Sequence, residues 1–159
     1  MLEDSPLTAE DVMTRDVKVV HPETPLLDAV RLMADNHISG LVVVDEQNRP
    51  VGMLTEGDLL RWHGEFTERQ AWWLDHLSEG TELAPTFMDA IRSQQRKVKK
   101  LMVESAITVF PETSTRDIAR LFYERKIKRV PVVQDDKLVG LVSRADLLRA
   151  LVAELAKKG

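Results

Sequence analysis

Val51-Gly-Met-Leu-Thr-Glu-Gly-Asp58 occurs a second time, in altered form, as Val139-Gly-Leu-Val-Ser-Arg-Ala-Asp146, and Leu-Leu-Arg follows both copies. Each copy leads from an apolar run through a hydroxyl residue, Thr55 or Ser143, to a carboxylate three residues later. A β-rich run followed by this spacing of hydroxyl and acid predicts a strand that ends where a helix begins. The rest of the chain repeats in register with these two segments, and they therefore decide the fold.

The repeat extends well beyond the two segments. Pro22-Glu-Thr24 aligns with Pro111-Glu-Thr113 at an offset of 89 residues, and from Gly52 and Gly140 onward the offset is 88. The change in length falls in residues 45–50 and 134–137, which are predicted hairpin loops, where insertions are tolerated. A sequence repeated with its flanking elements indicates two copies of one structural unit.

Each copy predicts a short strand, a helix, two strands and a second helix. In the first copy these are an extended piece at 17–20, a helix that ends near Asn36, and strands at 41–44 and 51–54. Thr24 is the expected capping hydroxyl, with Pro25 as the first helical residue. In the second copy they are 107–109, a helix over 115–125, and strands at 130–133 and 138–142. Pro131 lacks an amide hydrogen and is expected at a strand's start or on a free edge.

The predicted fold class is α+β, with two β-α-β-β-α repeats packed sheet to sheet. The first repeat covers residues 8–62 and the second residues 98–156. Residues 63–97 predict a helical insertion with apolar residues at helical spacing. Trp72 lies off that apolar stripe, so it either packs inside the chain or meets a partner subunit.

Composition restricts the function classes. The 159 residues carry a net charge of −4 and no cysteine, which favours neither a polyanionic partner nor disulfides or thiolate metal sites. Residues 92–100 are locally basic, as either a solvated helix face or a site that attracts phosphates. No apolar stretch is long enough to span a membrane, and the four histidines lack metal-ligand spacing. The expected location is the cytoplasm, and no metal site, nucleic-acid partner or membrane partner is expected.

Several motifs together carry a family resemblance. They are Pro-Glu-Thr before a helix, Ile38-Ser-Gly-Leu-Val-Val-Val-Asp45, Ile127-Lys-Arg-Val-Pro-Val-Val133, and Gly-x-x-Thr/Ser-x-x-Asp at the end of each repeat. The chain resembles a pair of cystathionine β-synthase (CBS) domains, the Bateman module, over residues 8–62 and 98–156. Its insertion is similar to that of bacterial stand-alone CBS-pair proteins. The resemblance implies two pseudo-twofold-related repeats that bind an adenosine-containing ligand, such as AMP, ADP, ATP, S-adenosylmethionine or a dinucleotide, in clefts between them.

The resemblance also assigns roles: the motif's carboxylate takes ribose hydroxyls and its Thr or Ser contacts the ribose or α-phosphate. The stronger of the two expected sites surrounds Asp146. Its residues are Thr14, Val17, Lys18, Ile38, Ser39, Lys128, Arg129, Leu141, Ser143, Arg144 and Asp146. The weaker site consists of Gly40, Met53, Thr55, Asp58, Ala106, Ile107 and Ile127. It is weaker because Glu56 stands where the other copy has Arg144, and an acid near phosphates opposes their binding.

Three functions remain open. The first is a regulatory module that senses an adenosine nucleotide as a regulatory ligand and requires no cofactor. The second is an interaction module with empty clefts that forms a homodimer through paired helices. The candidates for this contact are Leu59, Leu60, Phe122, Leu147, Leu148 and Leu151. The third, an enzyme, is not expected, because the sequence contains no P-loop, catalytic triad, paired carboxylates or metal-ligand set.

Overall fold

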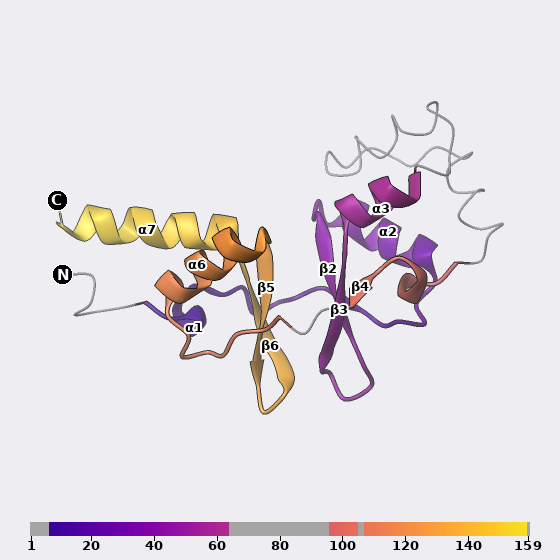
Figure 1. Cartoon of the computed structure of the whole chain (residues 1–159), viewed down its shortest axis with the longest axis horizontal. Coiled ribbons are helices and arrows are strands. Elements are labelled where there is room, and N and C mark those ends of the chain that lie inside the picture. The colour runs from indigo at the N-terminus through magenta and orange to yellow at the C-terminus, as the bar shows by residue number, and fades with distance from the viewer. Residues whose placement is uncertain (1–6, 64–95, 105–106, 159) are drawn as a thin grey trace. The chain divides into compact units, whose positions relative to one another are not determined.

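The computed structural model describes residues 7–63, 96–104 and 107–158, and of residues 60–63 and 158 only the backbone. It confirms the α+β class, with helices and two sheets (Figure 1). The chain forms two compact units, each described here by itself. Unit 1 contains residues 1–17, 48–50 and 106–159, and unit 2 contains residues 18–47 and 51–105. The predicted helical insertion, including Trp72, lies almost entirely outside the described residues.

Unit 2 is built on a sheet with the strand order β1-β2-β3-β4. Strand β1 runs parallel to β2, whereas β4 runs antiparallel to β3. The strands are β1 (Val19–Val20), β2 (Gly40–Val44), β3 (Pro50–Thr55) and β4 (Val103–Glu104). The helical segments are α2 (Leu26–Asp35), α3 (Glu56–His63) and the 3-10 turn η3 (Val98–Lys100).

Unit 1 is built on the antiparallel hairpin of β5 (Arg129–Gln134) and β6 (Lys137–Ser143). An isolated parallel bridge joins Val109 to Val132 on one side, and an antiparallel bridge joins Thr14 to Leu141 on the other. Its helices are α1 (Ala9–Val12), α6 (Thr115–Arg125) and α7 (Arg144–Lys158). If the bridged residues Val109 and Thr14 are counted as edge strands, unit 1 has the same strand order as unit 2, with shorter edge strands.

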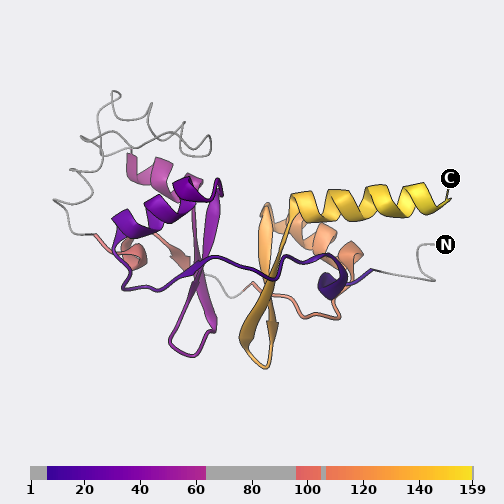
Figure 2. The same cartoon turned by 180° about the vertical axis from the view of Figure 1, so that it is seen from behind.

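The two sequence repeats exchange the short segments at their N-terminal ends. Val103, near the start of the second repeat, pairs with Met53 of the first, and Thr14, near the start of the first repeat, pairs with Leu141 of the second. Further backbone bonds follow the same rule, since Ala9 donates to the Thr113 carbonyl at 2.8 Å. Figure 2 accordingly shows the indigo segment that contains α1 beside the orange and yellow elements of unit 1. The hairpin of each repeat is therefore flanked by the N-terminal segment of the other repeat.

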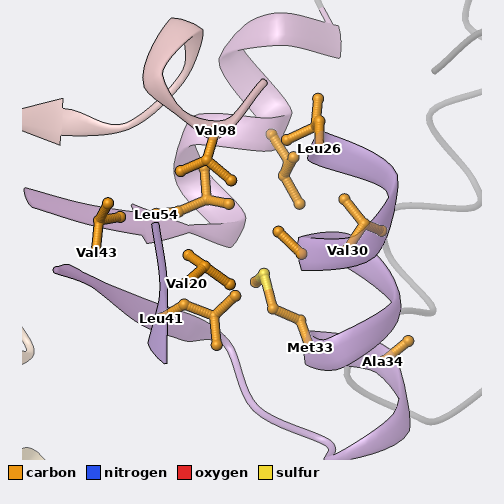
Figure 3. Packing of buried hydrophobic residues seen from close by; sticks show 11 residues of the cluster. Val20, Leu26, Val30, Met33, Ala34, Leu41, Val43, Leu54 and Val98 are labelled. Atoms are coloured by element: carbon orange, nitrogen blue, oxygen red, sulfur yellow. The ribbon is translucent and has the colours of Figure 1, made fainter. Parts of the chain in front are cut away.

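Each unit has its own apolar core. In unit 2, Leu26, Val30 and Met33 of α2 face the sheet residues Leu41 and Leu54 (Figure 3). These residues recur on one face of α2 at helical spacing, which is why the amphipathic pattern predicted this helix. The core of unit 1 consists of Ala9, Val109, Ile118, Phe122, Val130, Val132 and Val142.

Most predicted elements are confirmed, but the predicted strand at 107–109 is reduced to the isolated bridge of Val109, and two further details differ. Helix α2 is capped at its end by Asn36, and α6 spans residues 115–125 as expected. The prediction that Thr24 caps α2 is wrong: Pro25 is the N-cap, and the Thr24 hydroxyl instead accepts from the His21 amide in the preceding turn. Pro131 is the third residue of β5, between β6 and the Val109 bridge, rather than at a start or free edge. It is tolerated because that bridge uses the carbonyl of Pro131 and the amide of Val133.

An ionic cluster within unit 2 joins residues 97–99, which follow the predicted insertion, to Glu23 before helix α2. Lys99 and Lys97 both bind the Glu23 carboxylate, at 2.7 and 2.9 Å, and these hydrogen bonds lower the pKa of Glu23 to about 2. The backbone runs alongside, because Val98 donates to the Thr24 carbonyl at 2.9 Å. None of the helices in the described part of the chain has the length and apolar character needed to cross a bilayer.

Candidate functional site

The turn from β6 into α7 contains the second copy of the repeated motif. Asp146 is buried, with 4% of its surface exposed. Its Oδ2 accepts from the Ser143 amide at 2.8 Å and from the Ser143 hydroxyl at 3.0 Å. The Asp146 amide lies 3.2 Å from the Ser143 hydroxyl oxygen, which accepts in return. This reciprocal arrangement is a capping box, and it fixes the carboxylate at the start of α7.

Among the described residues, the same turn occurs twice more. Asp58 accepts from the Thr55 amide at 2.7 Å and the Thr55 hydroxyl at 3.1 Å, and Asp11 accepts from Thr8 at 2.8 and 3.0 Å. Asp11 makes these hydrogen bonds although it lies outside the repeated motif. The hydrogen-bond geometry by itself therefore indicates a helix cap and does not identify a ligand site. Burial separates the three, since Asp11 is exposed whereas Asp58 and Asp146 are 4% exposed. A buried carboxylate costs free energy unless it is fully paired, and these two positions therefore qualify as candidate sites.

Cationic residues lie beside the Asp146 turn. Arg129 is the register partner of Ser143 in the β5–β6 hairpin, and the Arg144 amide donates to the Lys128 carbonyl at 3.0 Å. The side chains of Lys128 and Arg144 are exposed and that of Arg129 is half-buried. These backbone pairings place Lys128, Arg129 and Arg144 next to the Asp146 turn, and their role in a ligand site stays a prediction.

The Asp58 turn has the same backbone with different charges. The Glu56 amide donates to the Ser39 carbonyl at 3.0 Å, which is the bond that Arg144 and Lys128 make in the other copy. The positions that are cationic in unit 1 are therefore occupied by Ser39, Gly40 and Glu56 in unit 2. This confirms the alignment on which the predicted difference between the two turns was based.

The glycines of the repeated motif, Gly52 and Gly140, lie in close contact with the exchanged edge segments. A Cβ atom on Gly52 would lie 2.7 Å from the Val103 carbonyl oxygen. A Cβ atom on Gly140 would meet the side chain of Met13, with Cγ at 2.8 Å. Each glycine thus permits close approach of the edge segment, which is a packing role that the sequence did not reveal.

The predicted site residues divide between the two units. Of the stronger set, unit 1 contains Thr14, Val17, Lys128, Arg129, Leu141, Ser143, Arg144 and Asp146, and unit 2 contains Lys18, Ile38 and Ser39. Of the weaker set, unit 2 contains Gly40, Met53, Thr55 and Asp58, and unit 1 contains Ile107 and Ile127, while Ala106 lies outside the described residues. Within unit 1, Thr14 pairs with Leu141 of strand β6. The Ser143–Asp146 turn begins at the last residue of the same strand. Ligand contact by these residues stays a prediction.

Sequence reasoning missed one residue of this turn, Arg149. Its guanidinium donates to Oδ1 of Asp146. The spacing of three residues between acid and base on a predicted helix was the available signal. In the part of the chain that the structure describes, no group of histidine, aspartate and glutamate side chains is arranged to hold a metal ion.

Comparison with known proteins gives a consistent family match. The family model for the CBS domain matches residues 9–65 and 98–153. An uncharacterized protein of Methanocaldococcus jannaschii is 30% identical over 152 residues, with 90% of each chain covered. The chloroplastic CBS domain-containing protein CBSX2 of Arabidopsis thaliana is 32% identical over 161 residues, and this match covers 90% of the present chain but only 63% of CBSX2.

Solved structures give the same result. The crystal structure of CBSX2 in complex with AMP has a TM-score of 0.70 and 29% identity, covering 93% of this chain and 98% of the other. The CBS domain of a CBS domain-containing membrane protein from Sphaerobacter thermophilus has a TM-score of 0.67 and 30% identity, covering 91% and 87% of the two chains. These solved structures thus share the fold of this chain.

Proposed function

Because the chain belongs to the CBS-domain family, we propose that it is a regulatory module that binds an adenosine-containing ligand such as AMP, ADP or ATP. The ligand acts as a signal: it shifts the equilibrium between arrangements of the protein to the extent that it binds them with different affinity. The proposed module is cytoplasmic and non-catalytic, and it needs no cofactor beyond the regulatory nucleotide.

The observation that carries this proposal is the buried Asp146 carboxylate with cationic residues beside it. A carboxylate accepts hydrogen bonds from ribose hydroxyls, and such charge-assisted bonds contribute about 1.5–3 kcal/mol each. Lys128 and Arg144, both exposed, supply positive charge for the phosphate. The AMP complex of CBSX2, a protein of similar sequence and fold, supports an adenosine nucleotide as the ligand class.

The two motif turns are proposed to differ in affinity. Glu56 places an acid where the Asp146 turn has Arg144, and an acid near phosphate groups opposes the binding of a polyanion. The Asp146 turn is therefore the stronger nucleotide site. The Asp58 turn is the weaker site, suited to a less anionic ligand.

Adenosine nucleotides are expected to raise the melting temperature of the protein. A ligand at about 100 times its dissociation constant adds roughly 2.7 kcal/mol to the free energy of unfolding, which corresponds to about 5–10 °C for a domain of this size. Thermal shift measurements with AMP, ADP, ATP, NAD and S-adenosylmethionine test this. No shift with any of them favours the interaction module, and release of phosphate from ATP supports an enzyme instead.

A second function, self-association, is favoured by an apolar stripe on α7. Leu148, Leu151, Val152 and Leu155 recur at the spacing of one helical face, and between 47% and 66% of each residue is exposed. Other predicted dimer contacts lie elsewhere: Leu59 and Phe122 are buried in the cores of their own units, and Leu147 packs against the core of unit 1. The side chain of Leu60 is not described. We propose that the α7 stripe contacts a second copy of the chain.

The double variant Leu151→Asp, Leu155→Asp is expected to convert a dimer into a monomer. Desolvating two carboxylates at an apolar contact costs several kcal/mol without compensating partners. Light scattering coupled to gel filtration measures the mass against the 18.1 kDa of one chain. Ala153→Asp, an exposed position of α7 outside the stripe, is the control and should remain dimeric. A wild-type protein that is monomeric at high concentration contradicts self-association.

A further inference from the structure

The Asp146 carboxylate is already engaged from two directions. Both donors on Oδ2 come from Ser143, at 2.8 and 3.0 Å, and Oδ1 receives the guanidinium of Arg149. The two ends of this ion pair differ in exposure, because the side chain of Asp146 is 4% exposed and that of Arg149 is 70% exposed. The ion pair thus joins a buried carboxylate to a guanidinium on a largely exposed side chain.

The number of acceptor positions then becomes limiting. A carboxylate offers about four lone-pair positions, two on each oxygen. Ser143 occupies both on Oδ2 and Arg149 occupies one on Oδ1, so a single position remains. A ribose diol donates two hydrogen bonds, and full engagement by both hydroxyls requires Arg149 to withdraw.

We propose that Arg149 is an internal competitor for the ribose diol at Asp146, which lowers affinity and sets how strongly the protein discriminates between ribose and deoxyribose. The inference rests on the proposed function, since it assumes that an adenosine ligand uses this carboxylate. One hydroxyl binds at the remaining position in either state. The second hydroxyl binds only when Arg149 has moved away.

The competitor is suited to being displaced. Arg149 lies on α7 one turn from Asp146, so the pair closes without any other rearrangement. Because the side chain of Arg149 is 70% exposed, its guanidinium stays solvated when it withdraws, and the ribose hydroxyls replace its hydrogen bond to the buried carboxylate. The effect on affinity is accordingly modest and lies within reach of an incoming diol.

The test compares adenosine with 2′-deoxyadenosine in Arg149→Met, which removes the charge and donors while keeping a long side chain with good helix propensity. Adenosine is used because it carries no phosphate charge that the loss of an arginine would affect. By isothermal titration calorimetry, adenosine is expected to bind Arg149→Met about two- to fivefold more tightly than wild type, with 2′-deoxyadenosine unchanged. Arg120→Met, an exposed arginine on α6 of the same unit, is the charge-matched control and should bind both nucleosides like wild type.

Ionic strength provides a second readout. Salt screens the exposed guanidinium end of this ion pair, so the advantage of Arg149→Met over wild type should shrink as potassium chloride is raised from about 0.05 to about 1 M. A purely structural role for Arg149 would change the melting temperature without changing the preference for the diol. Unliganded melting curves of both variants separate these effects.

The outcomes are distinguishable. If wild type binds adenosine and Arg149→Met shows the same ratio of affinities for the two nucleosides, the competitor role is wrong while the proposed function stands. Weaker binding of both nucleosides by Arg149→Met identifies Arg149 as a direct ligand contact and also overturns the inference. If neither adenosine nor AMP binds the wild type at millimolar concentration, the proposed function fails and the inference falls with it.

Discussion

Asp146→Asn is expected to weaken AMP binding about ten- to a hundredfold. The substitution keeps the shape of the side chain but removes its charge, and hydrogen bonds to a charged acceptor contribute about 1.5–3 kcal/mol. The carboxylate is also what the ribose hydroxyls are proposed to recognise. Titration calorimetry with AMP measures the change, and unliganded thermal unfolding measures how much of it arises from a weaker helix cap.

Asp11→Asn is the matched control for this variant. Asp11 accepts from Thr8 with the same geometry as Asp146 from Ser143, in the same unit, but is exposed and lies outside the motif. Its substitution should lower stability slightly and leave AMP affinity unchanged. Equal AMP affinity in wild type and Asp146→Asn reduces Asp146 to a helix cap. Loss of binding in Asp58→Asn but not in Asp146→Asn would show that the two sites are reversed.

Gly52→Ala is expected to destabilise the protein by about 1–3 kcal/mol, the usual cost of overpacking. The added Cβ would lie 2.7 Å from the Val103 carbonyl oxygen, which is a backbone atom of the neighbouring strand β4. Backbone cannot turn aside as a side chain does, so the β3–β4 pairing itself must shift. Thermal unfolding should show a melting temperature lower by about 2–4 °C for each kcal/mol.

Gly140→Ala is the comparison within the same molecule. Here the new Cβ meets atoms of the Met13 side chain, which has three rotatable bonds and adapts readily to irregular space. A smaller loss than in Gly52→Ala is expected, partly offset by the reduced freedom of the unfolded chain. A lower melting temperature for Gly140→Ala than for Gly52→Ala would show that contact with the exchanged segments does not determine the loss of stability at these two positions.

Helices, the hairpin and the equivalence of the two repeats could be predicted from the sequence, because they depend on local residue patterns and on the repeat itself. Helices α2 and α6 have apolar residues on one face, and the hairpin of β5 and β6 follows from two β-rich runs with a short loop. The alignment of the two repeats predicted that Arg144 is equivalent to Glu56 and Lys128 to Ser39. Equivalent backbone bonds confirm this.

Other features were not accessible because they depend on contacts between distant segments. A repeat aligns Thr14 with Val103 but does not say whether either pairs within its own copy or with the other, and both choices satisfy the same pattern. The roles of Gly52 and Gly140 follow from that choice. The misassigned cap at Thr24 has a different cause, since its hydroxyl had an alternative partner in the His21 amide three residues earlier.

The exchanged edges also have a consequence for the order of folding during synthesis. Every part of unit 2 lies between residues 18 and 105, so this unit can assemble once that stretch has left the ribosome. Unit 1 combines residues 1–17 and 48–50 with residues 106–159, and Thr14 of its first segment can pair with Leu141 only after β6 has been synthesised. Closing so long a loop is entropically costly and slow. A nascent chain therefore carries Ala9 and Thr14 without their partners Thr113 and Leu141 until those residues have been made, and a chain that stops before β6 leaves unit 1 without its hairpin.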